Sequence, residues 1–217
     1  MANFELNELQ QEFLRRFFAN TNCFFLSGGA ALVGYYLHHR HTQDLDLFTL
    51  ESEIEKGAAI VNQVARELGA DLEPLQTSPD FRRFLLRHGG EAIVVDLVRE
   101  YVFQVDSEKR DIEGVRVDSP EEILANKLCA LLSRSEVRDL VDVRALELAG
   151  FSLEDALEAA QKKDSGLTSA QLAWVLSEMR FGDDLVPPVD ISVAELRNYL
   201  DDLKTRLATM AFPKKLI

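Results

Sequence analysis

Apolar residues recur every three or four positions near the start of the chain, a spacing that predicts an amphipathic helix. Further along, the pattern predicts a short buried strand at 23–26, a helix at 30–38, a strand at 44–50 and a helix at 51–68. Two more strands are expected at 81–88 and 92–98, with Gly89-Gly90 as the hairpin turn between them. The apolar positions of the first helix are Phe4, Leu6, Leu9, Phe13, Leu14, Phe17 and Phe18.

The pattern changes from mixed to purely helical near Val117. Asp118-Ser119-Pro120 predicts a helix start, because a capping residue precedes a proline and two acids in the first turn. We therefore expect an α/β core domain over 1–117, a mixed β-sheet with flanking helices, and an all-α domain over 118–217. The helices expected in the second part lie at 120–133, 136–149, 152–163, 168–179 and 192–208, with breaks at Gly150, Gly166 and Pro187-Pro188.

The charge balance argues against a general nucleic-acid binder, which normally carries a basic excess. The 217 residues include 37 acidic and 24 basic side chains, for a net charge of −13. Contacts with a polyanion must therefore be local, at basic patches, although such patches are more often solvated surface than binding sites. These patches are Arg15-Arg16, His38-His39-Arg40-His41, Arg82-Arg83 and Arg87-His88.

The apolar segments and the cysteines suggest where the protein resides. No apolar run is long enough to span a bilayer, and the first residues do not resemble a secretory signal. Cys23 and Cys129 lie in apolar runs and are expected to be small buried side chains. A cytoplasmic protein is the resulting expectation. The histidines at 38, 39 and 41 lack the spacing of a metal site and are expected at the surface.

Asp44 and Asp46 are the strongest chemical signal. In a strand their side chains point to one face, while Leu45 and Leu47 point to the other. Two neighbouring carboxylates repel each other unless a positive charge lies between them, and Mg²⁺ is a common solution because it binds carboxylates together with phosphates. The alternative is an ordinary strand with one solvated polar face.

Asp96 is a third candidate acid. It lies within an apolar run that reads as a central strand, where an ionised carboxylate must be paired or metal-bound. The simple alternative is an ion pair with Arg99 or another arginine. Three acids on neighbouring strands suit a site that transfers phosphoryl groups with two metal ions.

Gly28-Gly29 follows a strand and opens a helix, so its backbone N–H groups can approach an anion. Ser27 can contribute a hydroxyl to a phosphate or simply cap the helix. Glycine pairs are also common in ordinary turns. The downstream aspartates favour the phosphate-binding interpretation.

The helix from Pro120 carries a second anomaly, because Lys127 lies within its apolar stripe and Arg134 follows on nearly the same side. Inward-facing cations need an anionic partner, which a triphosphate or an acidic side chain can supply. Asp139 or Asp142 beside Lys127 would set its orientation or the position of an acceptor hydroxyl. A purely structural pairing of Arg138 with Asp142, one helical turn apart, is the alternative.

These motifs together resemble a known family. Ser27-Gly28-Gly29 followed by Asp44-Leu45-Asp46 resembles the signature of the DNA polymerase β-like nucleotidyltransferases. The sequence pattern from Gly28 to Phe48 narrows the resemblance to the AbiEii-type nucleotidyltransferases, which include toxins of toxin–antitoxin systems. The later residues that carry the same resemblance are Lys127, Leu128, Ala130, Arg134, Arg138, Asp139 and Asp142.

The resemblance implies a role for each matching position. Ser27, Gly28 and Gly29 would hold the nucleotide phosphates, together with Lys127, Arg134 and Arg138. Asp44 and Asp46 would hold Mg²⁺, and Asp96 would be the third acid. The catalytic set it implies is Asp44, Asp46, Asp96, Lys127, Asp139 and Asp142.

The resulting hypothesis is a transferase that moves a nucleoside monophosphate from an NTP to an acceptor hydroxyl with two Mg²⁺ ions. The acceptor is either tRNA, as for a toxin with a cognate antitoxin, or a small molecule such as an aminoglycoside. The acidic composition suits a cationic small acceptor better than RNA. A nucleotide-binding module without catalytic activity is the third alternative. No membrane partner is expected.

Overall fold

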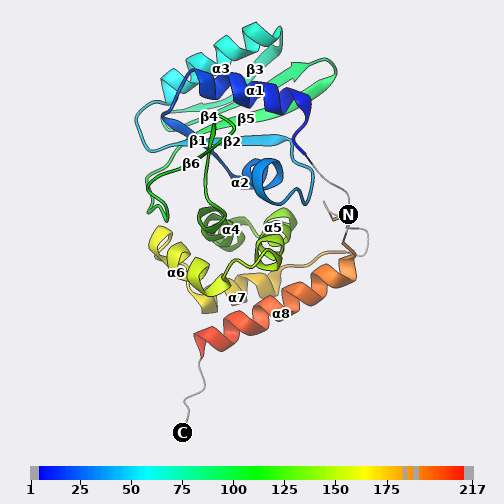
Figure 1. Cartoon of the computed structure of the whole chain (residues 1–217). Coiled ribbons are helices and arrows are strands. Elements are labelled where there is room, and N and C mark those ends of the chain that lie inside the picture. The colour runs from blue at the N-terminus through cyan, green and yellow to red at the C-terminus, as the bar shows by residue number, and fades with distance from the viewer. Residues whose placement is uncertain (1–4, 183–184, 188–190, 213–217) are drawn as a thin grey trace. The chain divides into compact units, whose positions relative to one another are not determined.

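The computed structural model describes residues 5–182, 185–187 and 191–212 (Figure 1). These divide into two compact units. The sheet unit comprises residues 5–101 and 106–119, and the helical unit comprises 102–105 and the described residues from Pro120 onward. The boundary expected between 117 and 118 falls just before this division, and the segment 102–105 was not expected to join the helices. Phe4 and Pro188, which entered the sequence predictions, lie outside the described residues.

The sheet unit is built on a mixed seven-stranded sheet with the order β3-β4-β5-β2-β1-β7-β6. β2 runs parallel to β5, and β1 runs parallel to β7, while the other neighbours are antiparallel. The mixed α/β core predicted from the sequence is therefore confirmed. The strands are β1 (Phe24–Ser27), β2 (Asp44–Thr49), β3 (Asp71–Ser78), β4 (Phe81–His88), β5 (Glu91–Arg99), β6 (Arg110–Ile112) and β7 (Val115–Val117).

The two faces of the sheet differ in polarity. Leu45 and Leu47 are fully buried on the face covered by helices α1 (Glu8–Ala19) and α3 (Ile54–Leu68), which Figure 1 shows on one side of the sheet. The helix α3 packs so closely on this face that a Cβ at Gly57 would collide with the Phe24 ring. Helix α2 (Gly28–Ala31) lies on the other side, where Asp44 and Asp46 point. The apolar face thus anchors the fold and leaves the acidic face for other contacts.

The helix predicted at 30–38 is more complex than expected. It begins at Gly28 as the short α2 and continues as a π-helical segment, η1 (Leu32–Tyr36). The backbone N–H of Leu37 donates to the carbonyl of Leu32 at 2.7 Å, the five-residue spacing of a π turn. Gly34 allows this segment to approach Leu6, because a Cβ at position 34 would collide with the leucine side chain.

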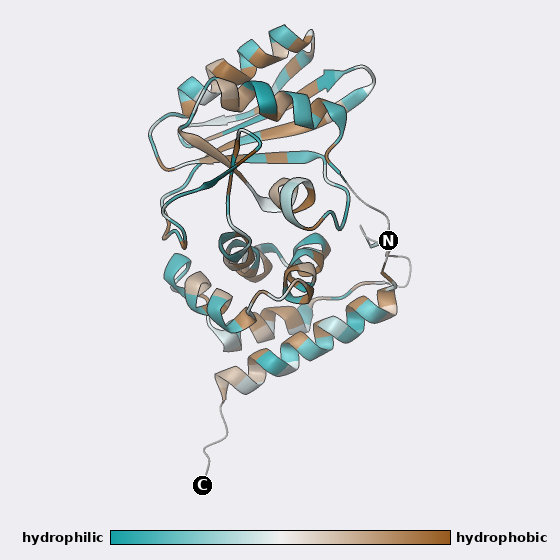
Figure 2. Cartoon of the chain, viewed as in Figure 1, coloured by the Kyte–Doolittle hydropathy of each residue, from teal (hydrophilic) through white to brown (hydrophobic). Residues whose placement is uncertain are grey.

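The helical unit confirms the all-α prediction for the second part of the chain. In Figure 2, α8 alternates polar and apolar residues along its length, as an amphipathic helix should. Leu196, Leu200, Leu203 and Leu207 form its buried side. The helices are α4 (Pro120–Arg134), α5 (Val137–Leu148), α6 (Leu153–Lys163), α7 (Ser169–Glu178) and α8 (Val193–Ala211).

Several expectations need correction. Strands β3, β6 and β7 were not predicted, because β3 is an exposed edge strand with Pro74 in it and the other two are only three residues long. Cys23 and Cys129 are half-buried rather than fully buried. His41 is exposed as expected, whereas His38 and His39 are half-buried.

Candidate active site

One row of side chains crosses four strands of the sheet unit. Ser27 on β1 is the register partner of Asp46 on β2, and Asp46 is the partner of Asp96 on β5. Asp96 is in turn opposite Arg83 on β4. Register partners point their side chains to the same face of a sheet, so these four groups lie side by side. Asp44, two residues before Asp46, points to this face as well.

We call Asp44, Asp46 and Asp96 the aspartate face. Asp44 and Asp46 are half-buried, whereas only 4% of Asp96 is exposed. The strand alternates between these acids and the fully buried Leu45 and Leu47, which fixes the direction of the carboxylates. A slip of one residue in register would place both leucines on the acidic face, so the apolar core holds the aspartates in position.

Asp96 is engaged by Arg83 through a two-pronged ion pair. Nε of Arg83 donates to Oδ1 of Asp96 at 2.8 Å, and Nη2 donates to Oδ2 at 2.6 Å. These hydrogen bonds raise the pKa of Arg83 further, and the charges of Asp44 and Asp46 act in the same direction. The alternative in which Asp96 pairs with an arginine is therefore realised, and its partner is Arg83 rather than Arg99.

Gly28 lies directly against Asp46. Its φ of +65° belongs to the left-handed region, and an added Cβ would collide with Oδ2 of Asp46. Gly29 has a different neighbour, because a Cβ there would meet the guanidinium of the buried Arg40. The two glycines thus bring the start of α2 up to an aspartate carboxylate on one side and a buried cation on the other. A side chain at position 28 would force either this backbone or the Asp46 carboxylate to move.

The donor set of the aspartate face fits a hard divalent cation. Carboxylate oxygens are the protein ligands that Mg²⁺ prefers, and the half-buried carboxylates of Asp44 and Asp46 lie on one face of β2. Within the described part of the chain, however, no three His, Cys, Asp or Glu side chains are already arranged around a common point as a metal centre. Asp44 and Asp46 are the acids of this face whose partial exposure fits such an ion, whereas Asp96 is buried and binds Arg83.

The helical unit contains a second group of predicted residues, which we call the lysine cluster: Lys127, Arg134, Asp139 and Asp142. Nζ of Lys127 lies 2.8 Å from Oδ1 of Asp139 and 2.7 Å from Oδ2 of Asp142. Arg134 binds Asp139 in a fork, with Nε to Oδ2 at 2.8 Å and Nη2 to Oδ1 at 2.9 Å. Both aspartates are fully buried.

The turn between α4 and α5 brings this cluster together. Ser135 adopts a φ of +50°, and its hydroxyl donates to the carbonyl of Leu131 at 2.9 Å, so α5 can begin only three residues after α4 ends. Burial alone would lower the pKa of Lys127, but the charges of Asp142 and Asp139 outweigh it and hold that pKa above its ordinary value. The lysine therefore remains charged inside the unit.

Arg138 lies outside the closed part of the lysine cluster. Its Nε donates to Oε2 of Glu136 at 2.5 Å. The predicted residues thus form two groups: Ser27, Gly28 and the aspartate face in the sheet unit, and the lysine cluster in the helical unit. The sequence suggested either Asp139 or Asp142 as the partner of Lys127. In the structure both contact it.

Arg83 is the site residue that sequence reasoning missed, although a signal for it was present. A two-residue turn at Gly89-Gly90 pairs His88 with Glu91, and counting back along both strands pairs position 83 with position 96. The hairpin was predicted, but its register was not extended to this pair. Arg82-Arg83 was treated only as a surface patch.

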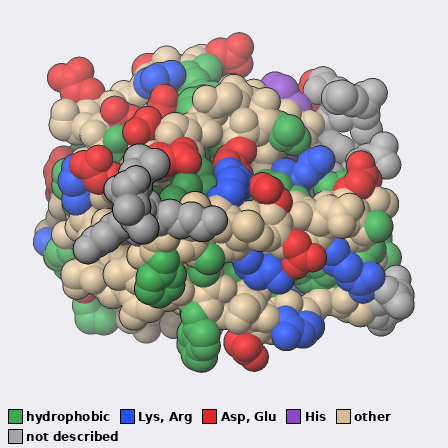
Figure 3. All heavy atoms as spheres, turned by 90° about the horizontal axis from the view of Figure 1, so that it is seen from below, with side chains coloured by type: hydrophobic (Ala, Val, Ile, Leu, Met, Phe, Trp, Pro, Cys, Tyr) green, Lys and Arg blue, Asp and Glu red, His purple; other side chains and the backbone are tan. Residues whose placement is uncertain are grey.

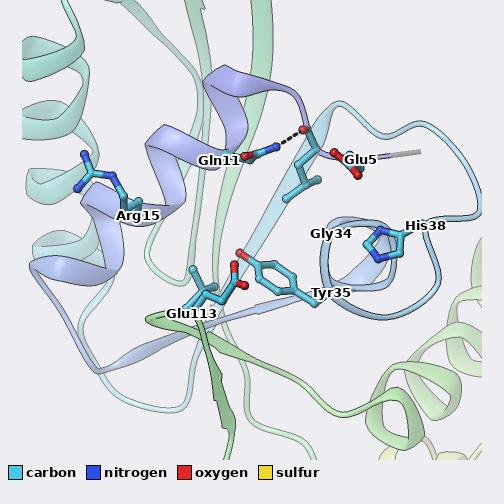
Figure 4. Close-up of a pocket in the computed structure, with 9 residues that line it drawn as sticks. Glu5, Gln11, Arg15, Gly34, Tyr35, His38 and Glu113 are labelled. Atoms are coloured by element: carbon cyan, nitrogen blue, oxygen red, sulfur yellow. Dashed lines mark hydrogen bonds between the residues drawn. The ribbon is translucent and has the colours of Figure 1, made fainter. Parts of the chain in front are cut away.

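A separate cavity of about 320 Å³ lies in the sheet unit (Figure 4). Glu5, Gln11 and Arg15 line it from the region of α1, and Tyr35 and Glu113 line it from η1 and the β6–β7 turn. In Figure 4 the Tyr35 hydroxyl and the Glu113 carboxylate point toward one another. Burial, helped by the charge of Glu113, raises the pKa of Tyr35 to about 12. None of the predicted nucleotide or metal ligands is among the residues that line this cavity.

The surface carries side chains of mixed charge and hydropathy (Figure 3). Acidic, basic and apolar side chains are interspersed on the face drawn in Figure 3. Across the described ranges, every helix is either too short or too polar to pass through a lipid bilayer.

The chain is similar to a protein family and to solved structures over most of its length. The family described as "Nucleotidyl transferase AbiEii toxin, Type IV TA system" matches residues 12–211. A crystal structure from H. pylori, provisionally described as a nucleotidyltransferase, superimposes with a TM-score of 0.62 at 20% identity, covering 94% of this chain and 97% of that one. JHP933 from Helicobacter pylori has a TM-score of 0.56 at 20% identity, covering 94% and 92%. At such identities these structures show a shared fold alone. Among curated proteins none matches the sequence.

Proposed function

Because the chain belongs to the AbiEii nucleotidyltransferase toxin family, we propose that it transfers a nucleoside monophosphate from an NTP to an acceptor hydroxyl in a Mg²⁺-dependent reaction. The observation that carries the proposal is the aspartate face beside the glycine turn. Asp46 lies in register with Ser27 and Asp96, and its carboxylate leaves no room for a side chain at Gly28. A strand end, a glycine turn and paired acids together suit a triphosphate bound through a divalent cation.

Asp44 and Asp46 are the residues that would hold Mg²⁺, which supplies charge neutralisation for the phosphates and activation of an acceptor hydroxyl. Ser27 and the backbone N–H groups at Gly28 and Gly29 would bind phosphate oxygens. Leu45 and Leu47 keep the two carboxylates on one face by filling the core behind them. In the sequence hypothesis, Asp96 helps to bind a second Mg²⁺ ion. In the structure the same carboxylate is paired with Arg83.

The lysine cluster receives its role from the family resemblance. We assign Lys127, with Arg134 and Arg138, to the negative charge of the nucleotide, and Asp139 and Asp142 to holding Lys127 in one orientation. The hydrogen-bond distances of 2.8 and 2.7 Å to the two aspartates support the orienting role. Because Lys127 has two buried partners, its ammonium cannot rotate freely, as a positioned phosphate ligand requires.

Two acceptors remain in competition. Membership of a toxin family favours tRNA as the acceptor and a cognate antitoxin as a partner. The net charge of −13 and the mixed surface favour a small cationic acceptor such as an aminoglycoside. We retain tRNA as the first proposal and the small molecule as the second.

The test is an incubation of the purified protein with each α-³²P-labelled NTP and Mg²⁺. Parallel reactions contain total tRNA, a panel of aminoglycosides and sugar alcohols, or no acceptor, and each is repeated with EDTA. Label in tRNA that requires Mg²⁺ supports the first proposal, and label in a small molecule supports the second. Nucleotide binding without transfer to any acceptor would instead favour a non-catalytic module.

A further inference from the structure

The pairing of Arg83 with Asp96 raises a question about the third acid of the site. Both oxygens of Asp96 accept a hydrogen bond from the same guanidinium, at 2.8 and 2.6 Å. Such a fork is the strongest common geometry for an arginine and a carboxylate. Asp96 is almost completely buried, while 43% of the Arg83 side chain is exposed. The arginine therefore covers the aspartate on its solvent side.

The row across the sheet explains why a cation is needed here. Asp46 and Asp96 are register partners on parallel neighbouring strands, and like charges placed directly opposite each other are destabilising. Arg83 lies at the next position in the same row, on the far side of Asp96 from Asp46. Its positive charge offsets the repulsion between the two aspartates without any bound ion.

We infer that Arg83 is a positioning residue that holds Asp96 and competes with a divalent cation for that carboxylate. The protein's own acids then bind one ion strongly, through Asp44 and Asp46, and Arg83 takes the place that a second ion would have beside Asp96. This inference rests on the proposed function, because it takes Asp44 and Asp46 as the metal ligands. It replaces the simple expectation that three equivalent acids share two ions.

Electrostatics gives the proposal its distinctive consequence. A guanidinium close to a metal site repels the incoming cation, and removing it leaves one more carboxylate available. Arg83→Gln should therefore bind Mn²⁺ more tightly than the wild type does, by about tenfold. The same variant should transfer nucleotide more slowly, because Asp96 is no longer held in place. A merely structural role would weaken both properties together.

The chain offers a matched control on the same strand. Arg87 lies on β4 four residues after Arg83, so it points to the same face, but its partner is Glu73 at 2.9 Å. Arg87→Gln removes the same charge from the same strand without touching Asp96. We expect its Mn²⁺ affinity to stay within about twofold of the wild type, since exposed charges are strongly screened.

The experiment is a titration of Mn²⁺ into the nucleotide-free protein, followed by electron paramagnetic resonance of the free ion. Wild type, Arg83→Gln, Arg87→Gln and Asp44→Asn are compared after circular dichroism has established that each is folded. Tighter binding by Arg83→Gln alone supports the proposal. Unchanged or weaker binding by folded Arg83→Gln overturns it. If Asp44→Asn binds Mn²⁺ as well as the wild type does, the proposed metal site itself is wrong.

A double variant keeps the proposal testable should Arg83→Gln fail to fold. Arg83→Gln/Asp96→Asn replaces the ion pair by two amides of similar shape and leaves the net charge of the row unchanged. If Arg83 holds Asp96 away from the ion, the double variant should bind Mn²⁺ within about threefold of the wild type. A loss of tenfold or more, about 1.4 kcal/mol, would show that Asp96 is itself a metal ligand and would overturn the inference.

Discussion

The aspartate face and the lysine cluster both contain neighbouring carboxylates, but two of the three in the aspartate face are more exposed than those of the cluster. Asp139 and Asp142 are completely buried, and both touch Lys127. Asp44 and Asp46 are only half-buried and belong to a strand whose opposite face is the apolar core. Burial in a closed cluster fixes the orientation of Lys127, whereas half-buried carboxylates on a rigid strand can be reached by a ligand from solvent. The difference favours the sheet unit for the metal ion, and the lysine cluster keeps the charge-neutralising role proposed for it.

The largest effect is expected when the cation Lys127 is removed from the lysine cluster. Lys127→Met leaves two buried aspartates with fewer partners, and losing one member of a buried ion pair destabilises by about 3–5 kcal/mol. Lys162→Met is the control, because Lys162 is exposed and pairs with Glu158 on the surface of α6. Urea unfolding followed by far-ultraviolet circular dichroism measures the loss, because the helical unit contributes helices α4 to α8 to the signal.

A second variant separates the buried charge from simple loss of packing. Lys127→Met/Asp142→Leu removes a cation and an anion together, so less uncompensated charge remains in the interior. We expect it to recover part of the stability that Lys127→Met loses. Equal destabilisation of the single and double variants would contradict the picture of a charge-balanced cluster.

The next largest effect is expected at the glycine turn of the aspartate face. Gly28→Ala forces an L residue into a φ of +65° and drives its Cβ into Asp46, so we expect a loss of about 1–3 kcal/mol together with weaker Mn²⁺ binding. Gly69→Ala is an unusually close control. Gly69 has the same φ of +65°, but a Cβ there has no neighbour within 4 Å. Equal Mn²⁺ affinities for the two variants would show that the contact with Asp46 is unimportant.

A smaller effect follows from the titration of Asp139. Burial raises its pKa, but the hydrogen bonds from Arg134 and Lys127 outweigh burial and hold the pKa below its ordinary value of 3.8. A depressed pKa in the folded state gives stability that is fully present above the unfolded-state pKa and lost as the pH falls through the folded one. The unfolding free energy of the helical unit should therefore fall below about pH 4.

Asp139→Asn provides the comparison for this pH dependence. We expect it to be less stable than the wild type at neutral pH, but it lacks the group whose protonation destabilises the native state in acid. Its unfolding free energy should change less than that of the wild type between about pH 4 and pH 2. Parallel curves for the two proteins would contradict the assignment of this pKa.

The site could be predicted where side-chain alternation and burial act over short distances. The alternation in Asp44-Leu45-Asp46-Leu47 determines which face of the sheet each side chain takes. The strand ends within one residue of its predicted end. The helical part was equally accessible, since α4 to α8 each lie within a few residues of a predicted helix. What the sequence could not provide was the partner of each charge. Asp96 had several candidate arginines, and only the register of the β4–β5 hairpin selects Arg83.

The strands that were missed show the other limit. β3 is mostly exposed and contains Pro74, so neither alternation nor apolar character marks it. It forms because β4 offers an unpaired edge, a tertiary cause that its own residues do not record. The π-helical segment after α2 packs through Gly34 against Leu6, a contact between separate parts of the chain that its own residues do not record.

The most direct measurement compares nucleotide transfer by the wild type with transfer by Asp44→Ala, in the presence of Mg²⁺ and the acceptor identified by the panel. Asp71→Ala, at an exposed position on β3, serves as the charge-matched control. The account predicts that Asp44→Ala loses activity on the order of a thousandfold while remaining folded, and that Asp71→Ala keeps the wild-type rate. Wild-type transfer by folded Asp44→Ala would contradict the assignment of the aspartate face as the active site.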